Sequence, residues 1–360
     1  MLMSGRTIIF LNIIYLAFFI SGHGQDIKGK ITDIQTGNPV AAANIFFANY
    51  QAGTYSDDSG FFHLKIPAYL PLQLVISHVS YVNKFMALDS LPRDNMLEVQ
   101  LNRKVRELEE VRISSDVDRE WNRNIKKFTH AFLGETDNSQ KCIITNSHII
   151  DFVREKDMLK AYSNGLIIVE NRAIGYRIHF LLEYFIMQGD QVSFSGKPYF
   201  ESMIAESEKE TNRWDKNRKF TYYGSLRHFL QTLLQGTTFT EGYEIVSGLL
   251  DHNNEFIFKG LTSPGDIIKK EKGMVYLNLK NTIQIIYTKE KDLTRTSGGM
   301  EGFKIDNDYQ TSYLSSRIAR IQMNENGTLY RPDLIHVYGF WAREGAADFL
   351  PFDYFPERNE

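Results

Sequence analysis

Three groups of polar side chains have types and spacings that could perform chemistry, and the first would bind a metal. His252 and Glu255 have the spacing of the short ligand pair in many zinc hydrolases, and His336 could supply the distant third ligand. In a chain with nine histidines and 44 acidic residues, roughly one such pair is expected by chance. His252 also lies in a turn-like Asp-His-Asn-Asn sequence, whereas a metal needs rigidly held ligands. We therefore expect no metal here.

A second pair could act as a nucleophile and its base. Ser225 precedes His228 by about one helical turn. However, Ser225 also stands at the start of a predicted helix, where a serine side chain accepts bonds from backbone N–H groups. The sequence has no Gly-x-Ser-x-Gly elbow, the turn that exposes a nucleophilic serine. A structural N-cap is the favoured interpretation, and Ser/His-dependent hydrolysis is the alternative.

The third group lies on a long predicted strand, residues 175–187. Its alternation places apolar side chains on one face and polar ones on the other, so we expect the polar face to be partly solvated. Arg177 and His179 on this face, together with Tyr184, are candidates for binding a polar or sugar-like partner. The alternative is an ordinary solvated sheet face. By the same alternation, one face carries Tyr176, Ile178, Phe180, Leu182, Tyr184 and Ile186, and the other carries Arg177, His179 and Glu183.

Other chemistry finds little support in the sequence. Glu183, Glu201 and Glu206 could pair as glycosidase carboxylates, but their separation cannot be obtained from the sequence. There is no phosphate-binding loop, dinucleotide fingerprint or Cys/His cluster, so we expect no cofactor. The net charge of −3 gives no bulk attraction to nucleic acid. The single cysteine, Cys142, excludes an intrachain disulfide framework, and we expect it to be a buried thiol.

The elements at the front of the chain have the patterns of short strands joined by tight turns. Alternating or apolar runs cover residues 28–32, 43–48, 61–66, 72–77, 81–86 and 97–101. Between them, Thr36-Gly37-Asn38-Pro39 and Asp57-Asp58-Ser59-Gly60 have the composition of turns. The acidic turn lacks the ligand spacing of a calcium loop, so we favour a plain hairpin turn. This pattern predicts an antiparallel β-sandwich.

Several of these residues also carry a family resemblance. They are Gly29-Lys30-Ile31-Thr32-Asp33, the turn at residues 36–40 with Ala43-Asn44-Ile45, and Ser56-Asp57-Asp58-Ser59-Gly60-Phe61-Phe62. The stretch resembles the carboxypeptidase regulatory-like domain, a transthyretin-like or Ig-like β-sandwich. The resemblance implies an accessory module without catalytic residues, such as the one at the N-terminus of TonB-dependent outer-membrane receptors of Gram-negative bacteria. No plug domain follows here, so we do not expect such a receptor.

The first residues are typical of an export leader. Arg6 precedes an almost unbroken apolar run, Thr7 to Ile20, and small residues then make cleavage after Gly24 plausible. A helix of this length falls short of the roughly 30 Å hydrocarbon core, so a cleaved signal is favoured over an uncleaved anchor. We therefore predict an exported protein, periplasmic or associated with the outer membrane of a Gram-negative bacterium, with no transmembrane segment after cleavage.

The remainder of the chain predicts an α+β domain rich in antiparallel sheet. Helices are expected at residues 121–132, 202–217 and 225–234, a meander at 148–187, further strands at 243–323 and a closing helix at 340–349. This half is similar to an uncharacterised region that often follows the regulatory-like module. The carrying residues include Phe132-Leu133-Gly134, Glu170-Asn171, Trp214-Asp215-Lys216-Asn217-Arg218, His228-Phe229-Leu230 and Tyr338-Gly339-Phe340-Trp341.

We therefore divide the chain into a signal peptide (1–24), a carboxypeptidase regulatory-like sandwich (25–113) and an α+β domain (114–360). The favoured hypothesis is a non-catalytic cell-envelope protein, in which the sandwich is an adaptor and the α+β domain binds an envelope protein or glycan. The alternative is an envelope hydrolase, metallopeptidase-like or Ser/His-dependent, with its site in the α+β domain. The two hypotheses differ in whether His228, His252 and His336 converge in one cleft with a carboxylate.

Overall fold

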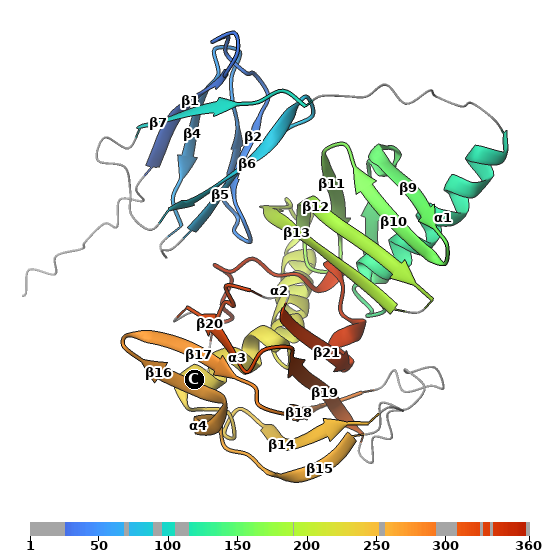
Figure 1. Cartoon of the computed structure of the whole chain (residues 1–360), viewed down its shortest axis with the longest axis vertical. Helices are drawn as coiled ribbons and strands as arrows, with labels where there is room; N and C mark the ends of the chain where they lie inside the picture. Colours follow the sequence, from blue (N-terminus) through green and yellow to red (C-terminus); the bar gives the residue numbers. More distant parts are fainter. Residues whose placement is uncertain are drawn as a thin grey trace, which may run out of the picture.

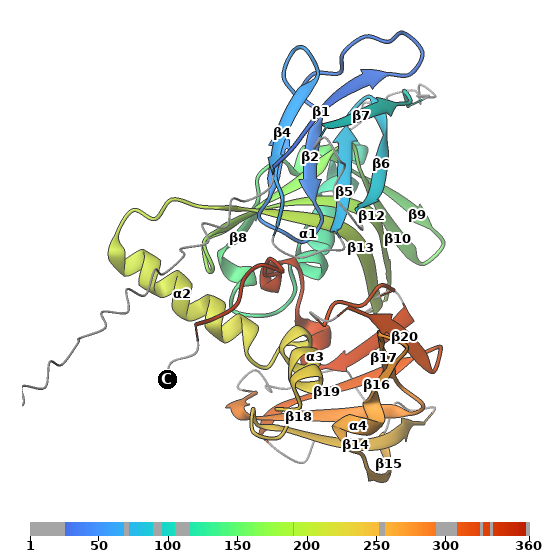
Figure 2. The same cartoon turned by 90° about the vertical axis from the view of Figure 1, so that its left-hand side faces the viewer.

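The computed structural model describes residues 26–67, 72–88, 96–104, 115–189, 191–251, 256–292, 308–324, 327–331 and 334–357. The fold is mostly antiparallel β-sheet, a β-sandwich followed by an α+β region, which confirms the predicted fold class. Figures 1 and 2 show the sandwich at one end, a sheet with one long helix in the middle, and two further sheets at the other end.

The sandwich consists of two facing sheets, ordered β4-β1-β7 and β3-β2-β5-β6. Their inner faces enclose a core that includes Ile31, Ile45, Phe62 and Leu74. In β4, Phe62 and Leu64 are buried while their neighbours are exposed, as the alternation predicts. The strands are β1 (Asp26–Asp33), β2 (Asn44–Phe47), β3 (Gly53–Tyr55), β4 (Phe61–Lys65), β5 (Leu72–His78), β6 (Tyr81–Leu88) and β7 (Met96–Leu101).

One strand pair of the sandwich departs from the antiparallel pattern. β7 runs parallel to β1, with Ile31 opposite Val99. This arrangement arises because β5 and β6 lie in the other sheet before the chain returns to β1, so the first and last strands become neighbours. Residues 108–113, whose sequence favours a last edge strand or the exit from the sandwich, lie outside the described residues.

The middle sheet is covered by helix α1 (Ser115–Leu133), whose Phe128 and Phe132 are fully buried against it. Gly134 ends the helix with a φ of +88°, a value that favours glycine. The sheet is not the predicted meander. β10 and β11 both pair with one edge of the 13-residue β12, which is long enough for two strands end to end. Its strands are β8 (Cys142–Ile144), β9 (Ile150–Glu155), β10 (Met158–Ser163), β11 (Leu166–Asn171), β12 (Tyr176–Gln188) and β13 (Gln191–Ser202).

Helix α2 (Glu208–Tyr222) binds the turn between β11 and β12. Trp214 stands in a charged run of the kind that usually forms a solvated face, but it is buried and its Nε1 donates to the carbonyl of Arg172. Arg218 donates to the carbonyls of Ile174 and Gly175 in the same turn. Helix α3 (Leu226–Gln235) follows, with Phe229, Leu230 and Leu233 in the core of the last region.

The last region has a five-stranded sheet, β15-β14-β18-β19-β21, and a three-stranded one, β16-β17-β20. The sequence pattern at residues 313–323 favours a single strand, but the chain leaves one sheet after β19 and enters the other at β20. The elements are β14 (Tyr243–Leu250), β15 (Phe256–Leu261), α4 (Pro264–Ile267), β16 (Ile268–Glu271), β17 (Met274–Asn278), β18 (Thr282–Lys291), β19 (Tyr309–Ser316), β20 (Arg320–Met323) and β21 (Ile335–Gly339).

The predicted closing helix at residues 340–349 is wrong. Two 3₁₀ turns, Phe340–Arg343 and Ala346–Asp348, stand there instead, separated by extended backbone at Gly345. The reason is close packing against the end of α1, because a Cβ on Gly345 would lie 2.5 Å from the backbone nitrogen of Gly134. None of the described helices combines the length and apolar character that a bilayer crossing requires.

Residues 349–357 form what we call the C-terminal strap. The N–H of its Phe352 donates to the carbonyl of Asn49 in the β2–β3 loop over 2.7 Å, and its ring packs against Tyr50. From the other side, the guanidinium of Arg227 in α3 donates to the carbonyls of Pro351, Phe352 and Tyr354. The strap therefore connects α3 to the sandwich.

Candidate functional site

The sandwich and the middle sheet meet along an apolar seam, formed by Phe46, Ala48, Val75, Leu166, Leu181 and Tyr199. Beside the seam, the β2–β3 loop pairs with β13. The N–H of Asn49 donates to the carbonyl of Pro198, and the N–H of Phe200 donates to that of Tyr50. Because these bonds fix β3 relative to β13, the two parts hold a common surface in place.

That surface is a cleft of about 910 Å³ between β3 and the outer face of the middle sheet. Its size falls within the range of about 300–1,000 Å³ that is usual for ligand sites. The sandwich forms one wall, and β11, β12 and β13, together with Thr145 just after β8, form the floor. The lining residues are Gln51, Gly53, Thr54, Tyr55, Thr145, Ile168, Glu170, Arg177, His179, Tyr199, Phe200, Glu201 and Ser202.

The floor is organised by Arg177, one of the residues predicted from the alternation of the long strand. Its Nη2 donates to Glu170 at 3.1 Å, and its Nη1 lies 3.3 Å from both carboxylate oxygens of Glu201. Arg177, Glu170 and Glu201 lie side by side on β12, β11 and β13, where cross-strand neighbours meet. The guanidinium is therefore held in one orientation.

His179 is the second predicted residue in the cleft. The residue is 5% exposed, and its ring stacks on that of Tyr199 with ring centroids 4.3 Å apart. Its Nε2 lies 3.1 Å from Glu201. The hydroxyl of Tyr199 is in turn 3.2 Å from that of Tyr55 on β3, so the contacts run from the floor to the wall.

Burial and charge set the protonation of this group. Burial lowers the pKa of His179, and the hydrogen bond to Glu201 offsets this only in part. Burial acts to raise the pKa of Glu201, but the bond from His179 and the charge of Arg177 outweigh it, so that pKa is lowered. At neutral pH the site therefore presents a carboxylate at Glu201 and a neutral donor at His179.

Tyr184, the third candidate, does not line the cleft. The register of β12 shifts between Leu182 and Tyr184, so the alternation changes phase. Phe185 and Met187 then point into the core, and Tyr184 turns to the opposite face, where it is 38% exposed. The predicted apolar face through Tyr184 and Ile186 is therefore wrong beyond Leu182. The bulge has no recognisable sequence pattern.

Ser225 and His228 stand at the start of α3. Ser225 is the N-cap, as expected, because its Oγ accepts from the backbone N–H of His228 and donates to the carbonyl of Tyr222. The His228 ring is buried, and its Nδ1 lies 2.9 Å from the hydroxyl of Tyr243 and 3.3 Å from the backbone nitrogen of Gly224. The Ser225 oxygen thus contacts the backbone of His228, and its hydrogen-bonding capacity is used locally.

The proposed zinc ligands are not brought together by the described residues. His252 and Glu255 lie outside them. His336 is on β21, where its Nε2 accepts from Nε of Arg317 at 3.1 Å. Within the described ranges, no three His, Cys, Asp or Glu side chains are grouped as a metal site would require. Of the proposed glycosidase carboxylates, Glu201 pairs with Arg177, whereas Glu183 accepts from Ser195.

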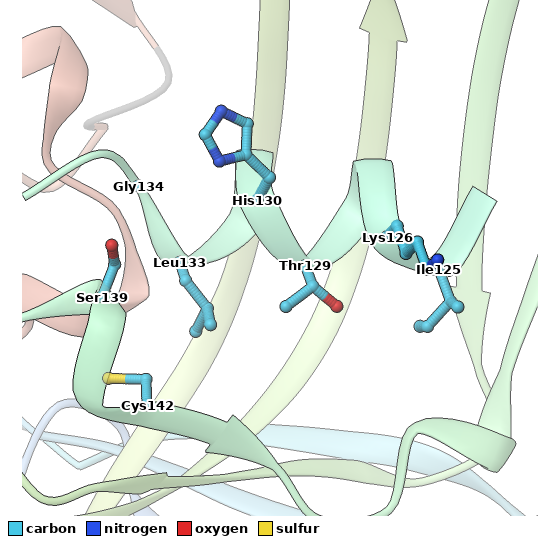
Figure 3. Close-up of a pocket in the computed structure, with 8 residues that line it drawn as sticks. All are labelled: Ile125, Lys126, Thr129, His130, Leu133, Gly134, Ser139 and Cys142. Carbon is cyan, nitrogen blue, oxygen red and sulfur yellow. The ribbon is translucent and has the colours of Figure 1, made fainter. Parts of the chain in front are cut away.

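A smaller hollow of about 350 Å³ lies beside α1. Figure 3 shows Leu133 and Cys142 on one side of the helix and the ring of His130 on the other. The Cys142 thiol donates to the carbonyl of Asn138, and burial raises its pKa to about 12. A thiol with that pKa stays protonated at neutral pH and is a poor nucleophile, so this hollow has no reactive group at Cys142.

Of the residues that line the cleft, the sequence pointed only to Arg177, His179 and Glu201 as candidates. Gln51 and Tyr55 belong to the sandwich, and no local pattern connects them to Arg177. Glu170 is one of the residues that carry the resemblance to the uncharacterised region, but the sequence assigned it no role in a site. A pairing rule for neighbouring hairpin strands could have placed Glu170 and Glu201 beside Arg177, because both strands adjoin β12 in the chain.

Comparisons with known proteins bear on the sandwich. Residues 27–113 match the CarboxypepD_reg-like domain. No curated protein matches the chain. Among solved structures, a type II cohesin–X-dockerin complex from Acetivibrio cellulolyticus is 19% identical, covers 22% of this chain and 57% of that one, and has a TM-score of 0.19.

Two other solved structures are similar over longer stretches. A 9R-lipoxygenase from Cyanothece PCC8801 is 8% identical over 58% of this chain and 48% of its own, with a TM-score of 0.18. The major pilin subunit BcpA of Bacillus cereus is 9% identical over 84% and 95%, with a TM-score of 0.16. This chain spans about half the length of the matched chains of the cohesin–X-dockerin complex and the lipoxygenase. TM-scores this low support no inference about fold or function.

Proposed function

We propose that this chain, whose residues 27–113 form a CarboxypepD_reg-like domain, is an exported, non-catalytic cell-envelope protein that binds a partner in the cleft. The apolar run from Thr7 to Ile20 supports export, and the accessory nature of the sandwich supports an adaptor role. On this proposal, the protein works in the periplasm or at the outer membrane of a Gram-negative bacterium.

The observation that carries the proposal is that the polar side chains of the cleft are held in place by hydrogen bonds and ring stacking. Arg177 is held between Glu170 and Glu201, and His179 is covered by Tyr199. These side chains lose little freedom when a ligand arrives, which favours binding. Their hydrogen bonds go to one another, an arrangement suited to recognition of a polar partner by a preformed surface.

Binding is tested with the mature chain, residues 25–360, by calorimetric titration. The probes are a panel of neutral oligosaccharides and a panel of short peptides of basic, neutral and acidic composition. We expect at least one class to bind, and Arg177→Ala and Glu201→Ala each to weaken that binding about tenfold or more, because each removes charged hydrogen-bonding groups.

The matched control is Arg213→Ala. It breaks a similar pair, Arg213 with Glu210 at 2.8 Å, on the exposed side of α2. This variant should bind like the wild type. Binding by neither class, or binding that is equally strong in the cleft variants, would overturn the proposed site.

Export is tested separately. Expression in a Gram-negative host, followed by fractionation and N-terminal sequencing, should recover the protein in the envelope fractions with Gln25 as its first residue. Recovery from the cytoplasm with Met1 or Leu2 first would contradict the export part of the proposal and leave the binding test unaffected.

A further inference from the structure

We propose that the partner in the cleft is an extended peptide segment of another protein, which adds to the free edge of β3 as a new strand. This inference rests on the proposed function of the cleft and names the class of its ligand. The observations that carry it are the register of β3, the way in which β3 lines the cleft, and the charge of the floor.

β3 lies at the edge of its sheet. Among the described strands it pairs only with β2, with Tyr55, Thr54 and Gly53 opposite Asn44, Ile45 and Phe46. Two hydrogen bonds just beyond the ends of β3 show which residue pairs of this ladder are hydrogen-bonded. The N–H of Phe47 donates to the carbonyl of Ala52, and the N–H of Ser56 donates to the carbonyl of Ala43.

Hydrogen-bonded pairs alternate with non-bonded pairs in an antiparallel ladder. The bonded pairs are therefore the ones at Ala52, Thr54 and Ser56. It follows that the backbone N–H and C=O groups of Gly53 and Tyr55 point away from β2, in the plane of the sheet. They form a row that another extended chain can pair with.

This free edge faces the cleft. Gly53, Thr54 and Tyr55 all line it, although the side chains of consecutive strand residues point to opposite faces. Three consecutive residues can line one hollow when the hollow runs along the edge of the strand. The Tyr55 hydroxyl meets that of Tyr199 at 3.2 Å, which brings this edge to the floor of the middle sheet.

The charge of the floor selects the side chains of the peptide. The charged lining residues are Arg177, Glu170 and Glu201, which leave one net negative charge. Glu201 is 53% exposed, whereas Glu170 is 22% exposed and also has Arg172 at 3.8 Å outside the cleft. Glu201 is therefore the group that faces the ligand, and it favours a basic or hydrogen-bond-donating side chain over an acidic one.

A peptide fits this combination better than an oligosaccharide. The edge of β3 presents donor and acceptor together at alternate residues, which is the spacing of another extended backbone. An oligosaccharide can bond to the floor, but its hydroxyls do not repeat at this spacing. The class of partner is thus an extended, basic-to-neutral segment of an envelope protein.

The test uses fluorescence anisotropy with the mature chain and labelled six-residue peptides. The first probe alternates threonine and lysine, the second alternates threonine and glutamate, and the third is the first with every backbone nitrogen methylated, so that neither edge can donate. We expect the lysine peptide to bind, and the glutamate and methylated peptides to bind about tenfold more weakly or worse, since charge or backbone pairing is lost. Neutral oligosaccharides serve as unlabelled competitors.

Variants of Tyr55 distinguish the contribution of its backbone N–H to peptide binding from that of its side chain. Tyr55→Ala removes the ring and hydroxyl but keeps the outward N–H, whereas Tyr55→Pro also removes that N–H without breaking a bond to β2. We expect Tyr55→Pro to bind the lysine peptide about fivefold more weakly than Tyr55→Ala, the effect of one lost hydrogen bond. Circular dichroism and thermal unfolding check that both variants fold. If Tyr55→Pro does not fold, the comparison of the lysine peptide with its methylated form tests backbone pairing instead.

The outcomes distinguish this inference from the proposed function. If oligosaccharides bind and the Arg177 and Glu201 variants weaken them while the peptides do not bind, the peptide inference is wrong and the cleft remains the binding site. Equal affinity for the lysine peptide and its methylated form would likewise overturn strand addition. If neither class binds, both the inference and the proposed function are wrong.

Discussion

The backbone N–H of Phe352 donates to the carbonyl of Asn49 over 2.7 Å, joining the last described segment of the chain to the sandwich near its beginning. The β2–β3 loop that carries Asn49 also bonds to β13 on its other side, through Pro198. This loop leads directly into β3, the wall of the cleft. The C-terminal strap therefore helps to position the proposed binding site.

The first prediction concerns the residue that holds the strap. Arg227 is half-buried and donates to three strap carbonyls, so Arg227→Ala would leave these carbonyls without their donor. We expect the free energy of unfolding to fall by about 3 kcal/mol or more. Arg227→Lys keeps the charge but not the planar fork, and should recover only part of the loss. Urea denaturation measures both, and a loss below about 1 kcal/mol for Arg227→Ala would contradict this role.

A second prediction uses two glycines with similar backbone angles and different surroundings. Gly175 has a φ of +69°, and an added Cβ would lie 2.2 Å from the ring of Trp214. Gly189 has a φ of +57° with open space around it. Gly189→Ala should cost about 1 kcal/mol from backbone strain alone, whereas Gly175→Ala should cost about 3 kcal/mol because α2 must also move. Equal unfolding midpoints for the two variants would show that Trp214 does not pack as described.

A third prediction concerns pH. Burial raises the pKa of Asp348 to about 6, although Thr136 and Asn138 donate hydrogen bonds to it. Between about pH 4 and pH 6 the unfolded carboxyl has lost its proton while the folded one retains it, so the contribution of this group to stability falls as the pH rises. The loss reaches up to about 3 kcal/mol above pH 6. Asp348→Asn should flatten the pH profile of the unfolding free energy in this window. An unchanged profile would place the pKa of Asp348 near its ordinary value.

A fourth prediction concerns the thiol. Because burial raises the pKa of Cys142 from 9.0 to about 12, its thiolate fraction at pH 8 should be about 1,000-fold lower than that of a free cysteine. Iodoacetamide should therefore modify the folded protein very slowly and the urea-unfolded protein at an ordinary rate. Mass spectrometry gives both rates. Rapid modification of the folded chain would show that the thiol is accessible and ionised.

Local rules were sufficient where neighbouring residues decide the structure. The alternation in β4 and the Ser225 cap before the apolar face of α3 each follow from a few consecutive residues. Arg177 and His179 were identified as a polar strand face for the same reason, and the structure places both in the cleft.

Long-range packing explains what the sequence did not reveal. The bulge beyond Leu182 changes which face Tyr184 occupies, and the contact between Gly134 and Gly345 replaces a helix with two short turns. The cleft depends on Tyr55 meeting Tyr199, residues that are 144 positions apart. No pattern within a single segment encodes such a contact.

The strap has a consequence for the order of assembly. During synthesis, residues 26–101 emerge long before Phe352, so the sandwich can close its own core before the N–H group that bonds to Asn49 has been made. The joint between the two halves becomes complete when the last stretch of chain arrives. A molecule without residues 349–357 would therefore carry a finished sandwich beside a binding surface that the strap does not hold in place.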